Sequence, residues 1–226
     1  NTEADSNTAL GYRAGKSVTT GSSNTLIGSL AGDALTIGDA NVAVGRSALS
    51  AEIQGDRSVA VGYAALQSQS NSSNADVYNT AVGYSAGLSV TTGVQNTLLG
   101  GIAGDALTDA DFNVALGYQA LSNDTLGSRS TALGRAALNA QNLTTATDAY
   151  NVAVGFNAGT TISTGVQNTL IGSLAGDALT DADFNVAVGQ TTLGADTLGS
   201  RSTAIGYAAL LSQNFTTATN SNNTAV

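Results

Sequence analysis

The chain has 226 residues, a formal net charge of −9, 5% aromatic residues and no Cys, His, Met, Pro or Trp. The acidic excess argues against nucleic acid or an anionic membrane surface as a partner, because both are bound through clustered Lys and Arg. Without Cys and His, disulfides, thiolate metal sites and the commonest general base are excluded. The 27 Gly and the scarcity of aromatic residues indicate a narrow interior filled by short side chains.

One short motif recurs along the chain: Asn or Ser, two or three small apolar residues, and then Gly. The steps between successive motifs are 17, 17, 17 and 21 residues, in a series that occurs three times. We number each repeat from its first Asn or Ser, which is position zero. A fixed period of this length is typical of stacked coils, so function is expected along an extended surface rather than in one pocket. The twelve first residues are Asn7, Asn24, Asn41, Ser58, Asn79, Asn96, Asn113, Ser130, Asn151, Asn168, Asn185 and Ser202.

This spacing divides the chain into three super-repeats of 72 residues each, 7–78, 79–150 and 151–222. Residues 1–6 are expected to end a preceding coil and residues 223–226 to start a further one, within one continuous solenoid domain of a longer array. The fourth repeat of each super-repeat is four residues longer than the others. Its additional polar residues, near 69–76, 141–148 and 213–220, are expected to bulge from one edge.

Position four is Gly in every one of the twelve repeats. An unbroken Gly position predicts a corner that needs a positive φ or a close approach of two backbones. The predicted corner residues are Gly11, Gly28, Gly45, Gly62, Gly83, Gly100, Gly117, Gly134, Gly155, Gly172, Gly189 and Gly206.

Short strands are expected at positions one to three, where β-branched or aliphatic residues flank a third residue, as in Val42 and Val44. Residues two apart share a strand face, so positions one and three are predicted to point into the coil. Ala at position seven, replaced only by Thr192, predicts a very near wall, and a frequent Gly at position fourteen indicates a second corner. A helix would carry interior Gly in each repeat at a cost of about 1 kcal/mol each. The sequence therefore predicts an all-β parallel β-solenoid of twelve coils.

The motifs SVAVG at 58–62, NVALG at 113–117 and NVAVG at 151–155 resemble the head repeats of trimeric autotransporter adhesins, the YadA-like family. NTAVGY at 79–84 is equally similar to repeats of bacteriophage tail fibres. The resemblance covers nearly the whole chain, although these coils are longer than the compact adhesin repeats. It implies a left-handed β-roll, three chains side by side, and exposure on a cell or virion, where the protein spans distance and attaches.

From the resemblance we expect a structural and adhesive extracellular fibre segment of a cell surface or virion. Its expected partners are copies of itself, as a homotrimer or an end-to-end assembly, and a host-surface glycan or protein receptor. Two alternatives stay open: a self-assembling extracellular filament of one repeat protein, and a monomeric solenoid that binds a ligand or ice. We expect no enzyme activity, cofactor, nucleic acid or membrane contact, because no pocket-forming feature interrupts the repeat and the one Lys, Lys16, does not recur.

Aromatic residues recur at position five, just past the glycine corner. Such rings stack on sugars or anchor protein interfaces; alternatively they cover the corner or lie between the chains of a trimer, which we favour because half of the position is not aromatic. The candidate binding residues are Tyr12, Tyr63, Tyr84, Tyr118, Phe156 and Tyr207.

Acidic residues gather before two repeats, where Asp109 and Asp111, and likewise Asp181 and Asp183, approach the next Asn. Calcium is conceivable at such oxygen ligands, but the first super-repeat lacks one of these Asp residues, so a turn-forming role is predicted and no metal is expected. The Asn residues of position zero are predicted to form a ladder of amides from coil to coil, interrupted by Ser at every fourth rung.

Overall fold

The structure, a computed structural model, describes residues 5–226, and this part is all-β without a helix. Of the expected end of a preceding coil at 1–6, residues 1–4 lie outside the described residues. Contacts divide the chain into two compact units, Asn1–Phe112 and Asn113–Val226, here called the N-terminal unit and the C-terminal unit. The division falls inside the second super-repeat, between its second and third coils.

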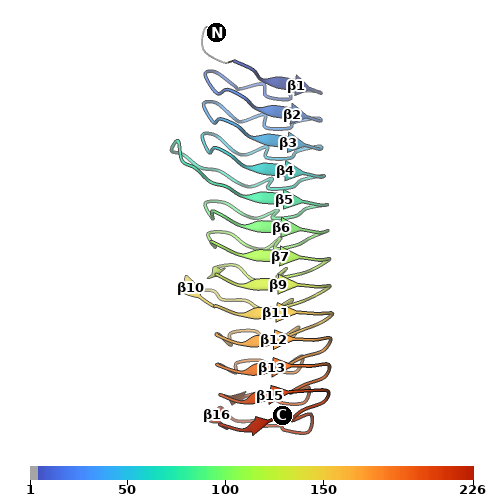
Figure 1. Ribbon diagram of the computed structural model, residues 1–226. Helices are drawn as coiled ribbons and strands as arrows, with labels where there is room; N and C mark the ends of the chain where they lie inside the picture. Colours follow the sequence, from blue (N-terminus) through green and yellow to red (C-terminus); the bar gives the residue numbers. More distant parts are fainter. Residues whose placement is uncertain (1–4) are drawn as a thin grey trace. The chain divides into compact units, whose positions relative to one another are not determined.

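The N-terminal unit contains one parallel sheet whose strand order follows the chain, as Figure 1 shows. Each strand has three residues and comes from positions one to three of one repeat. The strands are β1 (Thr8–Leu10), β2 (Thr25–Ile27), β3 (Val42–Val44), β4 (Val59–Val61), β5 (Thr80–Val82) and β6 (Thr97–Leu99).

The C-terminal unit repeats this plan and adds short strand pairs at the inserted residues. Its main sheet has the order β7 (Val114–Leu116), β9 (Thr131–Leu133), β11 (Val152–Val154), β12 (Thr169–Ile171), β13 (Val186–Val188), β15 (Thr203–Ile205) and β17 (Thr224–Ala225). In addition β8 (Gly127–Ser128) pairs with β10 (Thr147–Asp148), and β14 (Gly199–Ser200) with β16 (Thr219–Asn220), all in parallel.

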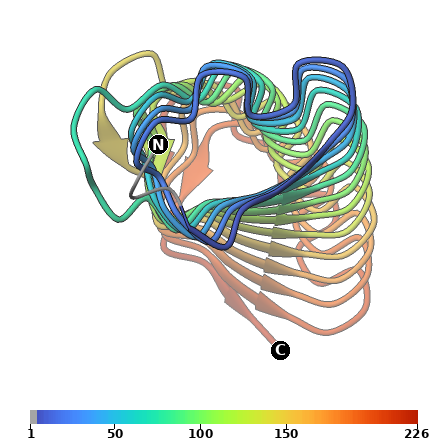
Figure 2. The ribbon, with the colours of Figure 1, turned by 90° about the horizontal axis from the view of Figure 1, so that it is seen from above.

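Each repeat makes one complete coil. Val42 pairs with Val59 across a short repeat, and Val59 pairs with Thr80 across a long one, so equivalent positions stay aligned despite the insertion. Within each unit the chain runs along the near side in Figure 1 and returns behind it while it descends, which is a left-handed winding that Figure 2 shows from above. The predicted parallel β-solenoid is confirmed.

The prediction that positions one and three point into the coil is wrong. The inward residue of each strand is position two, which is Ala or Leu and is fully buried from Leu26 to Ala204, whereas its two neighbours are half-buried or exposed. With three residues per strand, only the middle side chain enters the narrow interior, and the outer two share the opposite face. The apolar residues of positions one and three therefore lie on the outside.

At the glycine corner, φ lies between +119° and +143° in all the described repeats. A Cβ on Gly117 would lie 2.5 Å from the carbonyl oxygen of Gly134 in the next coil, far inside contact distance. Position four therefore requires Gly for two reasons, a φ that L residues rarely adopt and a backbone stacked directly above it. The Gly residues of position fourteen have no such φ; a Cβ on Gly21 would lie 2.5 Å from the carbonyl oxygen of Gly38, so close approach alone selects them.

The Asn residues of position zero are buried and tie each coil to the next. For Asn168, the side-chain amide donates to the carbonyl of Ala182 at 2.7 Å and to Oδ1 of Asn151 at 3.3 Å, while its own Oδ1 accepts from the backbone N–H of Asn185 at 3.0 Å. The predicted amide ladder is present, but its shortest bonds go to backbone groups. These bonds satisfy backbone donors and acceptors that the coil interior would otherwise leave unpaired.

Where Ser replaces Asn, a buried Gln from the inserted residues completes the ladder. Gln141 donates to Ser130 Oγ at 3.0 Å and to Oδ2 of Asp124, and its Oε1 accepts from the amide of Asn151 at 2.9 Å. Gln69 and Gln141 are both 0% exposed. The prediction that the insertions bulge outward is thus wrong at their first residue, although the loops that follow do project from the coils in Figure 2.

The acid that accepts from this Gln is also buried. Position eleven is apolar in the first two coils of a super-repeat, as at Val90 and Leu107, but acidic in the third coil. Asp124 accepts hydrogen bonds from the backbone N–H groups of Gly127 at 3.2 Å and Leu143 at 2.9 Å. A buried carboxylate is tolerated only with such partners. The three buried acids are Glu52, Asp124 and Asp196.

Candidate functional site

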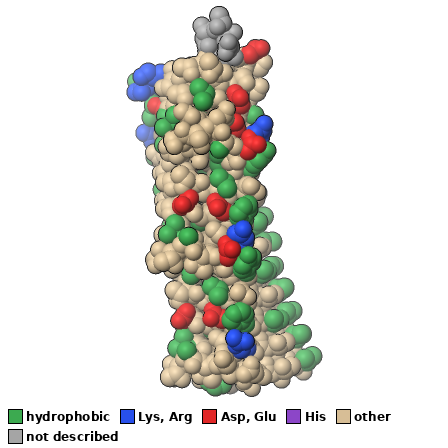
Figure 3. All heavy atoms as spheres, turned by 90° about the vertical axis from the view of Figure 1, so that its left-hand side faces the viewer, with side chains coloured by type: hydrophobic (Ala, Val, Ile, Leu, Met, Phe, Trp, Pro, Cys, Tyr) green, Lys and Arg blue, Asp and Glu red, His purple; other side chains and the backbone are tan. Residues whose placement is uncertain are grey.

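The outward face of the main sheet carries exposed apolar side chains in each unit. It consists of positions one and three of successive coils, here called the sheet face. In the C-terminal unit Leu116 is 48% exposed, Ile171 39% and Ile205 41%, and in the N-terminal unit Val82 is 38% exposed. Hydrophobic side chains gather along one margin of the molecule in Figure 3. A row of exposed aliphatic side chains on a regular sheet is a surface suited to burial against another protein.

The candidate residues of position five border the sheet face, and stacking contacts join several of them to the next coil. The Tyr63 and Tyr84 rings are stacked with centroids 5.3 Å apart, and the Arg46 guanidinium lies 5.5 Å from the Tyr63 centroid. Arg135 lies in the same way 5.4 Å from the Phe156 centroid. The exposed fractions at this position are 71% for Tyr12, 44% for Tyr63, 63% for Tyr84, 53% for Tyr118, 48% for Phe156 and 79% for Tyr207.

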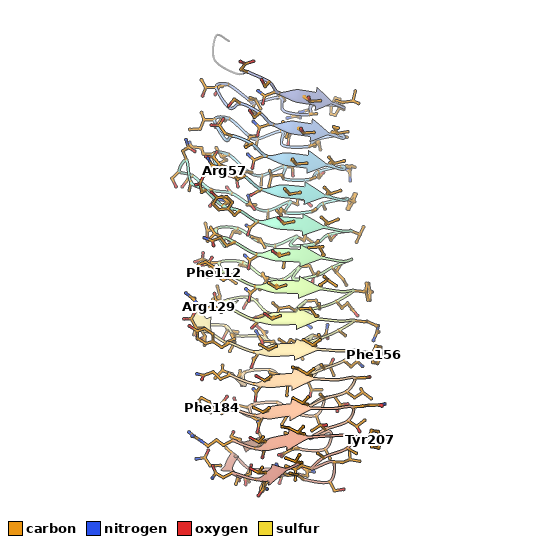
Figure 4. All side chains as sticks on the ribbon, viewed as in Figure 1. Arg57, Phe112, Arg129, Phe156, Phe184 and Tyr207 are labelled. Carbon is orange, nitrogen blue, oxygen red and sulfur yellow. The ribbon has the colours of Figure 1, made fainter. Side chains whose placement is uncertain are left out.

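A second row of aromatic and Arg residues lies just before the strands, at the last position of seven repeats: Arg57, Tyr78, Phe112, Arg129, Tyr150, Phe184 and Arg201. In the C-terminal unit this row, with Arg129 and Phe184, lies on the side where the strands begin. Phe156 and Tyr207 of position five lie on the side where the strands end (Figure 4). Sequence reasoning missed this row because its residues alternate among unlike types. The recurrence of Tyr just before position zero, after each of the first two insertions, was the available signal.

An Arg and a Tyr of the second row form a closed group with an Asp at the end of the insertion, here called the Arg–Asp–Tyr cluster. Arg129 forms an ion pair with Asp148 at 2.6 Å, its guanidinium lies 5.9 Å from the Tyr150 centroid, and the Tyr150 hydroxyl donates to Asp148 Oδ2 at 3.3 Å. The cluster of the N-terminal unit is made in the same way by Arg57, Asp76 and Tyr78. Tyr78 and Tyr150 stay 48% and 50% exposed.

The third super-repeat lacks this cluster. Asn220 stands in the place of the Asp and Asn222 in the place of the Tyr, while Arg201 donates to Asn220 Oδ1 at 3.1 Å and lies 4.9 Å from the Phe184 centroid. Strands β14 and β16 nevertheless pair as β8 and β10 do, with Ser200 opposite Asn220. The inserted residues can therefore be held to the previous coil without the Asp and the Tyr.

The acidic residues considered for calcium act singly as hydrogen-bond acceptors for the previous coil. Asp109 accepts from the hydroxyl of Thr92 at 2.6 Å, and Asp111 accepts from the backbone N–H of Val94 at 2.7 Å. Asp183 accepts in the same way from the backbone N–H of Val166 at 2.8 Å. Within residues 5–226 no three acidic side chains form a group that could hold a metal ion. The described geometry thus gives these residues a role in coil stacking.

Three carboxyl groups have a shifted pKa. Burial raises the pKa of Asp56, Asp105 and Asp177 above the ordinary value, because loss of water disfavours the charged form. Oδ1 of Asp105 is buried and has no hydrogen-bond partner. These groups lie apart from one another in separate coils, so they do not constitute an acid–base site, and the described part of the chain contains no pocket.

Comparison of the chain with protein-family models, with curated proteins and with solved structures gives no match. Among residues 5–226 there is no helix long and apolar enough to cross a membrane.

Proposed function

We propose that this chain is a structural and adhesive segment of an extracellular fibre, on a cell surface or a virion, whose chains associate side by side as a homotrimer. The observation that carries the proposal is the sheet face, with aliphatic side chains exposed at regular intervals along each unit. Burial of apolar surface is worth about 25 cal/mol per Å². Because each coil repeats the same small contribution, a long apolar face that meets its copies around a threefold axis can hold chains together without a specialised pocket.

The composition supports a fibre rather than a catalyst. The described residues offer no pocket and no cluster of metal-ligating side chains, and each coil is stabilised by its neighbours through the Asn and backbone bonds. Such a solenoid maintains its geometry over any number of repeats and can span distance. The acidic net charge of −9 keeps separate assemblies apart in solution.

The mass of the chain in solution tests the association. We expect light scattering after size-exclusion chromatography to give three times the chain mass of 22.3 kDa. The triple variant Leu116→Lys, Ile171→Lys, Ile205→Lys places charge on the sheet face and is expected to be monomeric. A monomeric wild type contradicts the trimer.

The matched control places three Lys residues on exposed loop positions instead, as Asn123→Lys, Thr145→Lys, Thr217→Lys. It carries the same added charge and is expected to keep the wild-type mass. If it dissociates equally, net charge rather than the sheet face governs assembly. A mass that increases with concentration beyond three chains indicates the alternative, a filament of one repeat protein. Binding of fluorescent protein to bacterial and animal cells tests the adhesive part.

A monomeric ice-binding solenoid is the second candidate, favoured by one observation. Position one places Thr side chains on the outward face of a regular parallel sheet, at Thr8, Thr25, Thr80, Thr97, Thr131, Thr169, Thr203 and Thr224. Val occupies this position in the other coils, and position three is aliphatic throughout the described strands, so a double Thr row is not formed. Thermal hysteresis by the wild-type protein, lost in Thr169→Tyr, would establish this function.

A further inference from the structure

We propose that each Arg–Asp–Tyr cluster is a shallow binding site for an uncharged sugar ring of a surface glycan. The proposal rests on the adhesive function proposed above and names its ligand. It assigns attachment to Tyr78 and Tyr150, beside the insertions, and leaves the aromatic residues of position five to the association of chains.

Contacts within the cluster hold the Tyr ring in place before any ligand binds. In the C-terminal unit the Arg129 guanidinium packs against the Tyr150 ring, and the carboxylate of Asp148 accepts from the Tyr hydroxyl. Half of the Tyr150 surface nevertheless remains in contact with solvent. An aromatic ring that is already fixed but still exposed loses little entropy when a ligand stacks on it.

The third super-repeat indicates that the Asp and the Tyr are not needed to hold the insertion. If the Asp and the Tyr served only to fasten the insertion, that super-repeat would need them as well. Its strands β14 and β16 keep the register of β8 and β10 although Asn220 and Asn222 replace both residues. Attachment of the insertion to the previous coil therefore does not explain the exposed Tyr rings of the first two super-repeats.

The chemistry of the cluster indicates the class of ligand. A ring face binds the C–H face of a sugar, and the neighbouring carboxylate and guanidinium can accept from and donate to adjacent hydroxyl groups. The charges of Arg129 and Asp148 cancel within the cluster, and the chain as a whole carries −9, so an anionic glycan would be repelled. An uncharged hexose or N-acetylhexosamine fits these constraints.

The first and second super-repeats each carry one cluster, which matters for affinity. A shallow site that contacts one sugar ring binds weakly, but several such sites on one fibre engage a glycan-covered surface together. Loss of one cluster should therefore weaken attachment to a dense surface, and loss of both should abolish it.

The test uses the full chain on an array of printed uncharged and sialylated oligosaccharides. We expect the wild type to bind uncharged glycans, and the double variant Tyr78→Ala, Tyr150→Ala to bind at least about tenfold more weakly. The matched control is Phe112→Ala, Phe184→Ala, which removes two exposed rings of the second row that lie outside the clusters and should leave binding unchanged. Circular dichroism and the thermal midpoint confirm that both variants are folded.

A gain of binding provides the converse test. Asn220→Asp with Asn222→Tyr builds a third cluster around Arg201 and should strengthen binding to densely printed glycans by about threefold or more through multivalency. The proposal is overturned if the double variant binds like wild type, or if only sialylated glycans or only protease-sensitive cell-surface proteins are bound. If the protein binds cells but no glycan on the array, this site is refuted and the proposed adhesive function stands. If it binds neither cells nor glycans, the site and the adhesive function are both refuted.

Discussion

Gly117→Ala tests the geometry on which every coil depends. Gly117 has φ +138°, and a Cβ there would lie 2.5 Å from the carbonyl oxygen and 2.6 Å from the carbonyl carbon of Gly134. The unfavourable φ costs about 1–3 kcal/mol. Relief of the clash requires the next coil to move, at a further cost of about 1–3 kcal/mol, as in overpacked cores. We therefore expect a loss of about 2–6 kcal/mol in the free energy of unfolding.

The same position supplies its own control. Gly206 has φ +119°, but a Cβ there would have no atom within 4 Å. Gly206→Ala should therefore show only the cost of the φ, about 1–3 kcal/mol. The difference between the two variants measures the stacking of one coil on the next.

Thermal unfolding followed by circular dichroism gives this difference as a shift of the midpoint. At about 2–4 °C per kcal/mol for a domain of this size, Gly117→Ala should melt about 2–12 °C below Gly206→Ala. Amide hydrogen exchange should locate the loosened bonds near Gly117 and Gly134, because a solenoid loses stability locally. Equal midpoints for the two variants would show that the coils do not press on one another at this corner.

Two further predictions concern buried polar groups. Gln141→Leu leaves the Asp124 carboxylate and the Asn151 amide each without one partner, and should lower the free energy of unfolding by about 2–4 kcal/mol in a denaturant titration. Adding Asp124→Leu to Gln141→Leu should recover part of this loss. If the double variant loses more stability than the two single variants together, the pairing is refuted. Burial raises the pKa of Asp177, so the ionised carboxylate lowers the free energy of unfolding at pH values above its folded pKa. This destabilisation is absent below the unfolded pKa of about 4. Asp177→Asn should thus melt higher than wild type at pH 7, with a gap that closes as the pH falls toward 4, and a gap independent of pH would exclude Asp177 as its source.

The sequence alone was sufficient for the repeat, the coil length and the position-four corner. At φ near +138° a Cβ is excluded, so Gly is obligatory and its recurrence is visible in the sequence. The coil has further left-handed residues that no such pattern reveals, as at Ala136 with φ +54° and Leu138 with φ +50°. A φ near +55° is costly but accessible to any residue, so hydrogen bonds between coils can hold it there without leaving a mark in the composition.

The direction of the strand side chains could not be predicted from alternation. Val at positions one and three suggested that these residues form the apolar interior. In a wider sheet the more hydrophobic face is the buried one. Here each strand has at most three residues, so its middle residue, Ala or Leu, faces inward and the two flanking residues remain outside.

The candidate surfaces were only partly predictable for a related reason. The aromatic residues of position five were identified because they follow a fixed glycine, whereas the Arg–Asp–Tyr cluster joins residues of two repeats of unequal length. Asp148 comes from the end of an insertion and Arg129 from the preceding coil, 19 residues away. The insertion shifts the phase between them, so their contact became visible only with the coils in place.

The buried acid and its glutamine limit where this array can gain or lose coils. Deletion of the fourth coil of the second super-repeat would place the Asp124 carboxylate opposite Ile162, where no amide could satisfy it. Exchange of a complete set of 72 residues returns every acid to its glutamine. Recombination between copies is therefore expected to yield viable chains only where the third and fourth coils of a super-repeat stay together, as they do when complete sets of four coils are exchanged.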